Sequence, residues 1–147
     1  MIPFLVLAVL FVVLSGLGKL GVVPFGWWTS LRFALAGMFL LSASAHWGKK
    51  RPDLIRMVPA AFPRPDVLVT ATGILEILGA VGLMAAGTAR YAAAGLGLMM
   101  VAMFPANVKA AREGLSIGGR RVPGLIPRTI LQIVFVGAAA AVVMGGR

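Results

Sequence analysis

The stretch VLVTATGILEILGAVGLMAAG at 67–87 carries a single charged residue, Glu76, among apolar, small and threonine residues. A helix needs about 20 such residues to cross roughly 30 Å of hydrocarbon. Four further runs of this kind lie at 2–20, 29–47, 90–111 and 125–145. None shows the alternation of a membrane β-strand. The sequence therefore predicts an all-α membrane protein, a bundle of transmembrane helices that forms one domain over residues 1–147.

The composition agrees with this class and excludes several others. Of the 147 residues, 60% are hydrophobic and 12% charged, whereas soluble domains average about 45–50% and about 25%. The absence of cysteine excludes disulfides, iron–sulfur clusters and thiolate chemistry. With one histidine and four scattered acidic residues, we expect no bound metal. The net charge of +10 lies in loops beside apolar runs, where it indicates topology, so the expected partner is the lipid bilayer and not nucleic acid.

The basic residues also predict an orientation. With five spans, loops 48–66 and 109–128 fall on the side of the N-terminus. These loops hold ten of the fourteen basic residues: Lys49, Lys50, Arg51, Arg56, Arg64, Lys109, Arg112, Arg120, Arg121 and Arg128. The positive-inside rule then predicts a protein of the cell (inner) membrane, with a cytoplasmic N-terminus and the C-terminus outside.

Two segments allow alternatives. The first run, 2–20, has the apolar core of a signal peptide, but it lacks a basic start, and Lys19 follows the core, as at the end of a retained helix. In the loop after the second run, residues 52–58 predict a short interfacial helix that begins with Pro52 and has one apolar side. This helix either lies on the inner membrane surface or tucks under the bundle.

Glu76 is the first candidate site residue. An ionisable group near the bilayer centre costs a few kcal/mol and is by default a functional-site hypothesis. We expect Glu76 to be neutral at pH 7 unless a cation reaches it, because burial disfavours the charged form. Arg32 lies near the outer end of the second run, where it either reaches the outer headgroups or bridges to Glu76.

Further polar residues lie toward the inner side of the spans. His46 ends the second run and Ser42 lies one turn deeper. Asn107 follows Pro105, which is expected to kink the fourth run because proline removes a helix hydrogen bond. Together with Glu76 and with Gln132 in the fifth run, these residues predict a pocket that opens inward. Taken singly, each polar residue is also explained as a contact between helices.

The small residues Gly137, Ala141 and Gly145 recur at helical spacing on the last run. Such a ladder permits close helix contact. It fits packing within the bundle and a homo-oligomer contact equally well.

Four segments are distinctive in order and spacing: LRFALAGMFLLSASAHW (31–47), GILEILGAVGLM (73–84), MFPANVKAA (103–111) and RTILQIVF (128–135). With these segments the chain resembles the DoxX and DoxX-like family of small bacterial membrane proteins. The resemblance implies a core of four helices, to which residues 1–22 add an extra N-terminal helix. It also implies a link to membrane redox chemistry, since family members include a subunit of a thiosulfate:quinone oxidoreductase.

Three functional hypotheses follow. In the first, the protein binds a quinone or lipid-like ligand non-covalently and needs a soluble or membrane redox partner, because it has no redox group of its own. Whether it is itself an enzyme stays open. In the second, it is a non-enzymatic scaffold or assembly factor whose polar residues fix the bundle. A proton-coupled transporter is the third, against which the odd number of spans counts.

Overall fold

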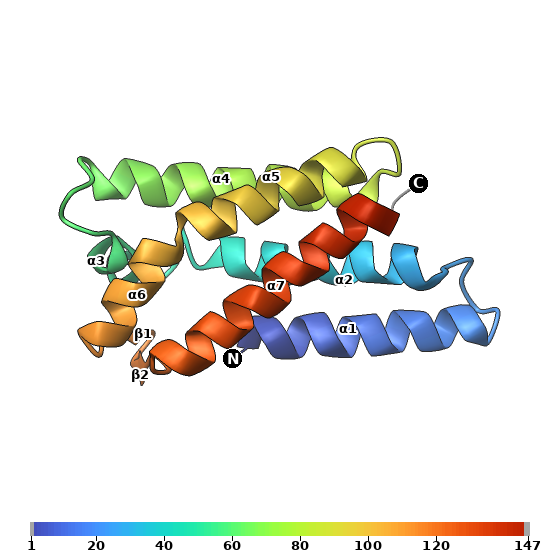
Figure 1. Ribbon diagram of the computed structural model, residues 1–147, viewed down its shortest axis with the longest axis horizontal. Helices are drawn as coiled ribbons and strands as arrows, with labels where there is room; N and C mark the ends of the chain where they lie inside the picture. Colours follow the sequence, from blue (N-terminus) through green and yellow to red (C-terminus); the bar gives the residue numbers. More distant parts are fainter. Residues whose placement is uncertain (1, 146–147) are drawn as a thin grey trace.

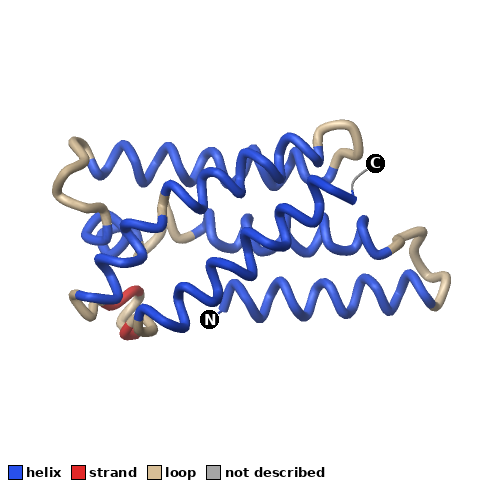
Figure 2. The backbone as a smooth tube through the Cα atoms, in the orientation of Figure 1, coloured by secondary structure: helices blue, strands red, loops and turns tan. Residues whose placement is uncertain are grey.

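The computed structural model describes residues 2–145, which are almost wholly helical (Figures 1 and 2). The helices are α1 (Ile2–Lys19), α2 (Trp27–Ser44), α3 (Arg51–Met57), α4 (Pro65–Met84), α5 (Ala89–Ala102), α6 (Phe104–Arg112) and α7 (Leu125–Gly145). Strands β1 (Ser116–Ile117) and β2 (Arg120–Arg121) form a short antiparallel hairpin between α6 and α7. The expected all-α class is confirmed, and the hairpin was not expected.

Four helical segments within residues 2–145 are long and apolar enough to cross a membrane. They are α1, α4, the α5–α6 pair and α7. The second expected span corresponds to α2, which does not reach this level of hydropathy. Its sequence includes Arg32 and three serines.

The polarity of α2 matches its place in the molecule. It packs against α1, α4 and α7, and it has eight buried residues, the most of any helix in residues 2–145. The core forms where Leu35 and Phe39 of α2 meet Leu83 of α4, Leu96 of α5 and Val142 of α7. Because neighbouring helices cover α2, its polar residues can form hydrogen bonds with other parts of the protein.

Glycines allow the helices to approach closely. A Cβ added at Gly79 of α4 would meet Leu96 of α5, and one at Gly37 of α2 would meet Leu10 of α1. Gly145, the last member of the expected small-residue ladder, lies against the ring of Trp28 in the same chain, whereas Gly137 has no atom near its missing Cβ. Part of the ladder therefore packs within the bundle.

The fourth expected span is interrupted beside its proline. Helix α5 ends at Ala102 and α6 begins at Phe104, with Met103 between them. Pro105 occupies the first turn of α6, where its missing N–H costs least. The expected kink is confirmed, and Figure 1 shows α6 turning away from the direction of α5.

Helix α3, the hairpin and α6 gather at one end of the bundle (Figure 1, left). Helix α3 packs against α4 and α6, and Lys109 Nζ donates to the carbonyls of Arg56 and Val58 at distances of 2.8 and 2.9 Å. The short helix expected at 52–58 thus tucks against the bundle.

The hairpin is tied to α3 by Asp53, whose Oδ2 accepts a 2.8 Å hydrogen bond from the Gly118 amide. Gly118 and Gly119 both adopt positive φ angles at the hairpin turn, which glycine tolerates without strain. Asp53 also pairs with Arg56. These hydrogen bonds hold the pKa of Asp53 below its ordinary value, the one from the Gly118 amide contributing most.

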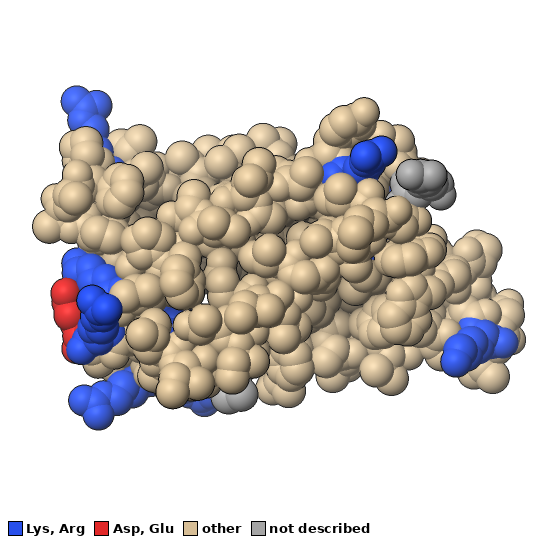
Figure 3. Space-filling view, viewed as in Figure 1, with Lys and Arg blue, Asp and Glu red and all other residues tan. Residues whose placement is uncertain are grey.

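The two ends of the bundle differ in charge. The loops with most of the lysine and arginine residues lie at the end with α3 and the hairpin, and blue atoms gather there in Figure 3. Lys19, Arg32 and Arg90 belong to the opposite half. We call the first end the basic end.

Candidate functional site

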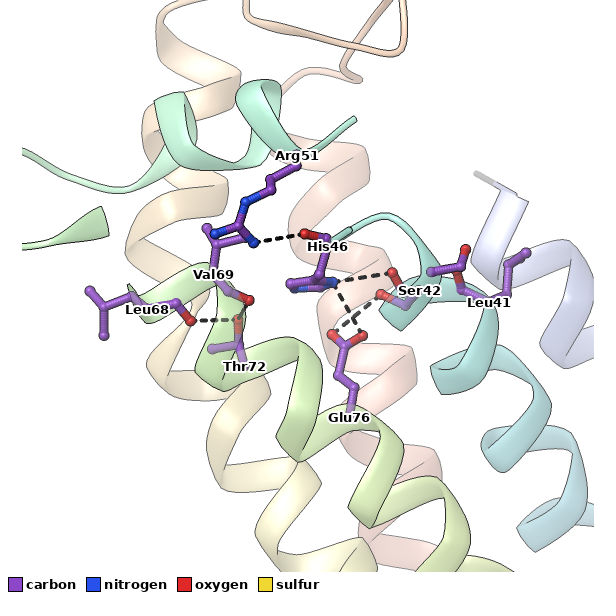
Figure 4. Close-up of polar contacts among 9 residues, drawn as sticks. Leu41, Ser42, His46, Arg51, Leu68, Val69, Thr72 and Glu76 are labelled. Carbon is purple, nitrogen blue, oxygen red and sulfur yellow. Dashed lines mark hydrogen bonds and ion pairs between the residues drawn. The ribbon is translucent and has the colours of Figure 1, made fainter. Parts of the chain in front are cut away.

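Ser42, His46 and Glu76 come together between α2 and α4 (Figure 4). Ser42 Oγ donates to Glu76 Oε1 over 3.3 Å, and His46 Nδ1 lies 3.9 Å from Glu76 Oε2. The side chains of His46 and Glu76 are only 4% and 5% exposed. We call this group the carboxylate cluster.

The position of His46 is held from two sides. Its Nδ1 lies 3.3 Å from the carbonyl oxygen of Ser42, and because a carbonyl only accepts, this contact requires a proton on Nδ1. Gly73 of α4 lies against the ring, since a Cβ there would come within 2.7 Å of His46 Cβ. The close approach of α2 and α4 therefore depends on this glycine.

Arg51, at the start of α3, fastens the same region. Its guanidinium donates to the carbonyl of His46 over 2.9 Å, to that of Asp66 over 3.1 Å and to Thr70 Oγ1 over 2.9 Å. It thus joins the end of α2 to the first turns of α4. Sequence reasoning placed Arg51 among the topology charges, because nothing in its spacing predicts these partners.

Asn107 and Gln132 form a second group, between α6 and α7. Asn107 Nδ2 donates to Gln132 Oε1 over 3.2 Å. Arg128 joins them, because its Nη2 donates to Asn107 Oδ1 over 2.8 Å. We call these three residues the amide cluster. Arg128 was not among the residues expected at the site.

Gln132 also contacts the end of α5. Its Nε2 donates to Met100 O over 2.6 Å, close to the last residue of α5, where helix carbonyls often lack intrahelical donors. Gln132 therefore joins α7 to the end of α5 beside the interruption.

A cavity of about 140 Å³ opens on the amide cluster. It is lined by the whole cluster and by apolar residues of α1, α7 and the connecting loop: Pro3, Phe4, Asn107, Pro123, Arg128, Leu131, Gln132 and Phe135. A second cavity, of about 280 Å³, lies between α4 and α5 and has only apolar and glycine lining. Neither of these two cavities is lined by residues of the carboxylate cluster.

The six expected site residues are thus divided. Within residues 2–145, no hydrogen bond or ion pair joins the carboxylate cluster to the amide cluster. Arg32 contributes to neither, since it donates to the carbonyls of Leu83 and Met84, each over 3.0 Å, and so caps the end of α4. The bridge from Arg32 to Glu76, one of the two arrangements considered for Arg32, is absent from the described part of the chain.

No group of three or more His, Cys, Asp or Glu side chains in the described range lies close enough to hold a metal ion. The carboxylate cluster can hold and exchange protons, because it contains two titratable groups. The amide cluster offers hydrogen-bonding groups to the cavity that it lines.

Comparison with known proteins gives one family. Residues 35–143, which are most of the chain, match the family described as a domain of unknown function (DUF8561). The match begins within α2, so α1 lies outside it. No curated protein and no solved structure matches the chain.

Proposed function

We propose that this chain, which belongs to the DUF8561 family, is a multipass membrane protein that binds a lipid-like ligand such as a quinone at the amide cluster. The observation that carries the proposal is the cavity of about 140 Å³ beside Asn107 and Gln132. Ligand sites in proteins combine an apolar lining with a few placed polar groups. The lining of this cavity also combines apolar residues with three polar side chains, those of the amide cluster.

The position of the cavity supports a ligand taken from the membrane. Arg128 lies in the first turn of α7, Gln132 one turn further and Phe135 close to a turn beyond that. The lining therefore changes from polar to apolar along α7, starting at the basic end. A molecule with a polar head and an apolar chain also changes from polar to apolar along its length, so it matches this lining.

The resemblance to DoxX proteins extends the proposal. It adds a four-helix core formed by α2 and the later helices, with α1 as an extra helix, and an association with membrane redox metabolism. The basic end would then face the cytoplasm, by the positive-inside rule. A quinone bound here would exchange electrons with a partner protein, since this chain offers no redox group.

The test is native mass spectrometry of the protein taken from membranes in mild detergent, with organic extraction of what co-purifies. We expect a stoichiometric isoprenoid or lipid with the unaltered chain. We expect the ligand to be lost in Gln132→Leu and retained in Ile133→Leu, a control at an exposed position of the same helix. An unliganded mass for the unaltered chain would contradict the proposal.

A second function, that of a scaffold, is favoured by one set of observations. Arg32, Arg51 and Lys109 each donate to main-chain carbonyls of other segments, which is how polar side chains fix the geometry of a bundle. On this alternative Glu76→Gln and Asn107→Leu lower the melting temperature and no ligand accompanies the protein.

A further inference from the structure

The hydrogen bonds of the amide cluster run in one direction. Arginine can only donate, so it meets Asn107 at the amide oxygen, and a carbonyl can only accept, so Met100 O meets the amide nitrogen of Gln132. With both ends determined, the middle bond runs from Asn107 Nδ2 to Gln132 Oε1. The chain of donors therefore begins at Arg128 and ends at the backbone of α5.

This direction leaves more donors than acceptors for a ligand, because the arginine adds N–H groups and no lone pairs. Each amide oxygen already accepts one hydrogen bond, and each amide nitrogen donates one. Arg128 Nη1 has no hydrogen-bond partner in the part of the chain that the structure describes, and it is covered by protein. Arg128 as a whole lines the cavity, so its charge favours a group that accepts hydrogen bonds.

The charge around the cavity also favours a ligand group that accepts hydrogen bonds. The residues that line the cavity include one arginine and no carboxylate. The cavity also lies beside the first turn of α7, a helix of 21 residues whose N-terminal end carries partial positive charge. An oxyanion in the cavity is attracted both by the guanidinium charge of Arg128 and by this field.

The size and lining of the cavity limit the rest of the ligand. At about 140 Å³, it is smaller than the roughly 300–1,000 Å³ pockets that enclose a drug-sized molecule. It admits a headgroup, whose chain would continue past Leu131 and Phe135 along α7 and past Phe4 of α1.

We infer that the amide cavity binds an amphiphile with an oxyanion headgroup, a carboxylate or a phosphate, which pairs with Arg128 while its hydrocarbon chain lies against Phe4 and Phe135. This inference rests on the proposed function and narrows it, because a neutral quinone does not use the charge of Arg128. It also gives α1, which lies outside the family match, a part in the wall of the site.

The experiment measures the affinity of delipidated protein, by calorimetry in a non-ionic detergent, for five probes: oleate, oleyl alcohol, a short-chain phosphatidic acid, inorganic phosphate and decylubiquinone. Oleate and oleyl alcohol differ only in the headgroup. We expect an anionic amphiphile, oleate or phosphatidic acid, to bind about ten-fold or more tightly than oleyl alcohol, as one charge-assisted hydrogen bond allows. Whichever of oleate and phosphatidic acid binds more tightly shows whether the site prefers a carboxylate or a phosphate. Inorganic phosphate should bind far more weakly than either.

Two substitutions accompany the probes. Arg128→Gln should reduce the affinity for the anionic amphiphile by about ten-fold or more, and Arg128→Lys, which keeps the charge, should recover part of it. Arg120→Gln removes an exposed charge of the hairpin and should leave the affinity unchanged. Circular dichroism and a monodisperse elution profile confirm that each variant is folded.

The other outcomes separate this inference from the proposed function. If decylubiquinone binds, needs Gln132 and is indifferent to Arg128→Gln, the function stands and the oxyanion is wrong. Equal binding of oleate and oleyl alcohol also overturns the oxyanion, and phosphate that binds as tightly as the amphiphiles overturns the hydrocarbon chain. If no probe binds the unaltered protein, both proposals fail.

Discussion

The carboxylate cluster and the amide cluster are both groups of polar side chains between helices, but they differ in how far they are buried. Glu76 and His46 are almost completely buried between α2 and α4, whereas Asn107, Arg128 and Gln132 line a cavity. The cause is local packing. Gly73 brings α2 and α4 together at the first cluster, while the break at Met103 separates α6 from the direction of α5 at the second. Whether polar residues of this helical bundle are enclosed or line a cavity thus depends on the backbone around them.

The largest expected effect comes from disturbing the close packing of the carboxylate cluster. Gly73→Ala places a Cβ within 2.8 Å of His46 and of the Trp47 ring. Overpacking of this kind costs about 1–3 kcal/mol, so we expect a clear fall in the melting temperature in detergent. Gly137→Ala is the matched control, because no atom lies within 4 Å of its added Cβ and alanine favours a helix. Equal stability of the two variants would show that the helices do not meet closely at Gly73.

A smaller effect on stability is expected at the amide cluster. Gln132→Leu removes the donor to Met100 O and the acceptor from Asn107. Hydrogen bonds between membrane helices average about 0.6 kcal/mol, with a maximum near 1.7. We therefore expect a modest fall in the free energy of unfolding together with a complete loss of ligand. A large fall, comparable with that of Gly73→Ala, would indicate that this cluster is mainly structural.

The smallest effect concerns the tie between α3 and the hairpin. Because the folded chain holds the pKa of Asp53 below its ordinary value, the charged carboxylate stabilises the fold at pH values above the ordinary aspartate pKa of about 4. This stabilisation is lost as the pH falls through the lower pKa of the folded chain. Asp53→Asn should be less stable than the unaltered protein at neutral pH, and the difference should shrink on acidification. Thermal unfolding between about pH 7 and pH 3 measures it, and a constant difference would contradict the assignment.

Sequence alone predicted the helical class, the approximate helix positions and the interruption near Pro105. Hydropathy and proline chemistry act locally, so these features are readable along the chain. It also selected Ser42, His46, Glu76, Asn107 and Gln132 as the polar residues of interest, but it joined them into one pocket. Which residues face each other depends on how the helices are rotated, and one sequence does not show that.

Arg128 and Arg32 also have partners that the sequence alone does not show. Arg128 was interpreted as a topology charge, although the structure shows it bonded to Asn107. Arg32 was expected either at the headgroups or beside Glu76. The second position is wrong, because Arg32 caps α4 through the carbonyls of Leu83 and Met84, and this cap was not expected. The last turn of α4 has no basic residue of its own, and Arg32 of α2 supplies donors to its terminal carbonyls.

Water access to the two clusters can be measured directly, because the chain has no cysteine and each introduced thiol reports alone. Leu131→Cys places a thiol in the lining of the amide cavity. Val69→Cys, which nearly conserves volume, places one on the buried face of α4 that also carries Glu76. In sealed inside-out vesicles treated with a small, charged thiol reagent, we predict rapid labelling at position 131 and very slow labelling at 69. Equal labelling, or labelling at 69 alone, would contradict the division into one open and one closed cluster.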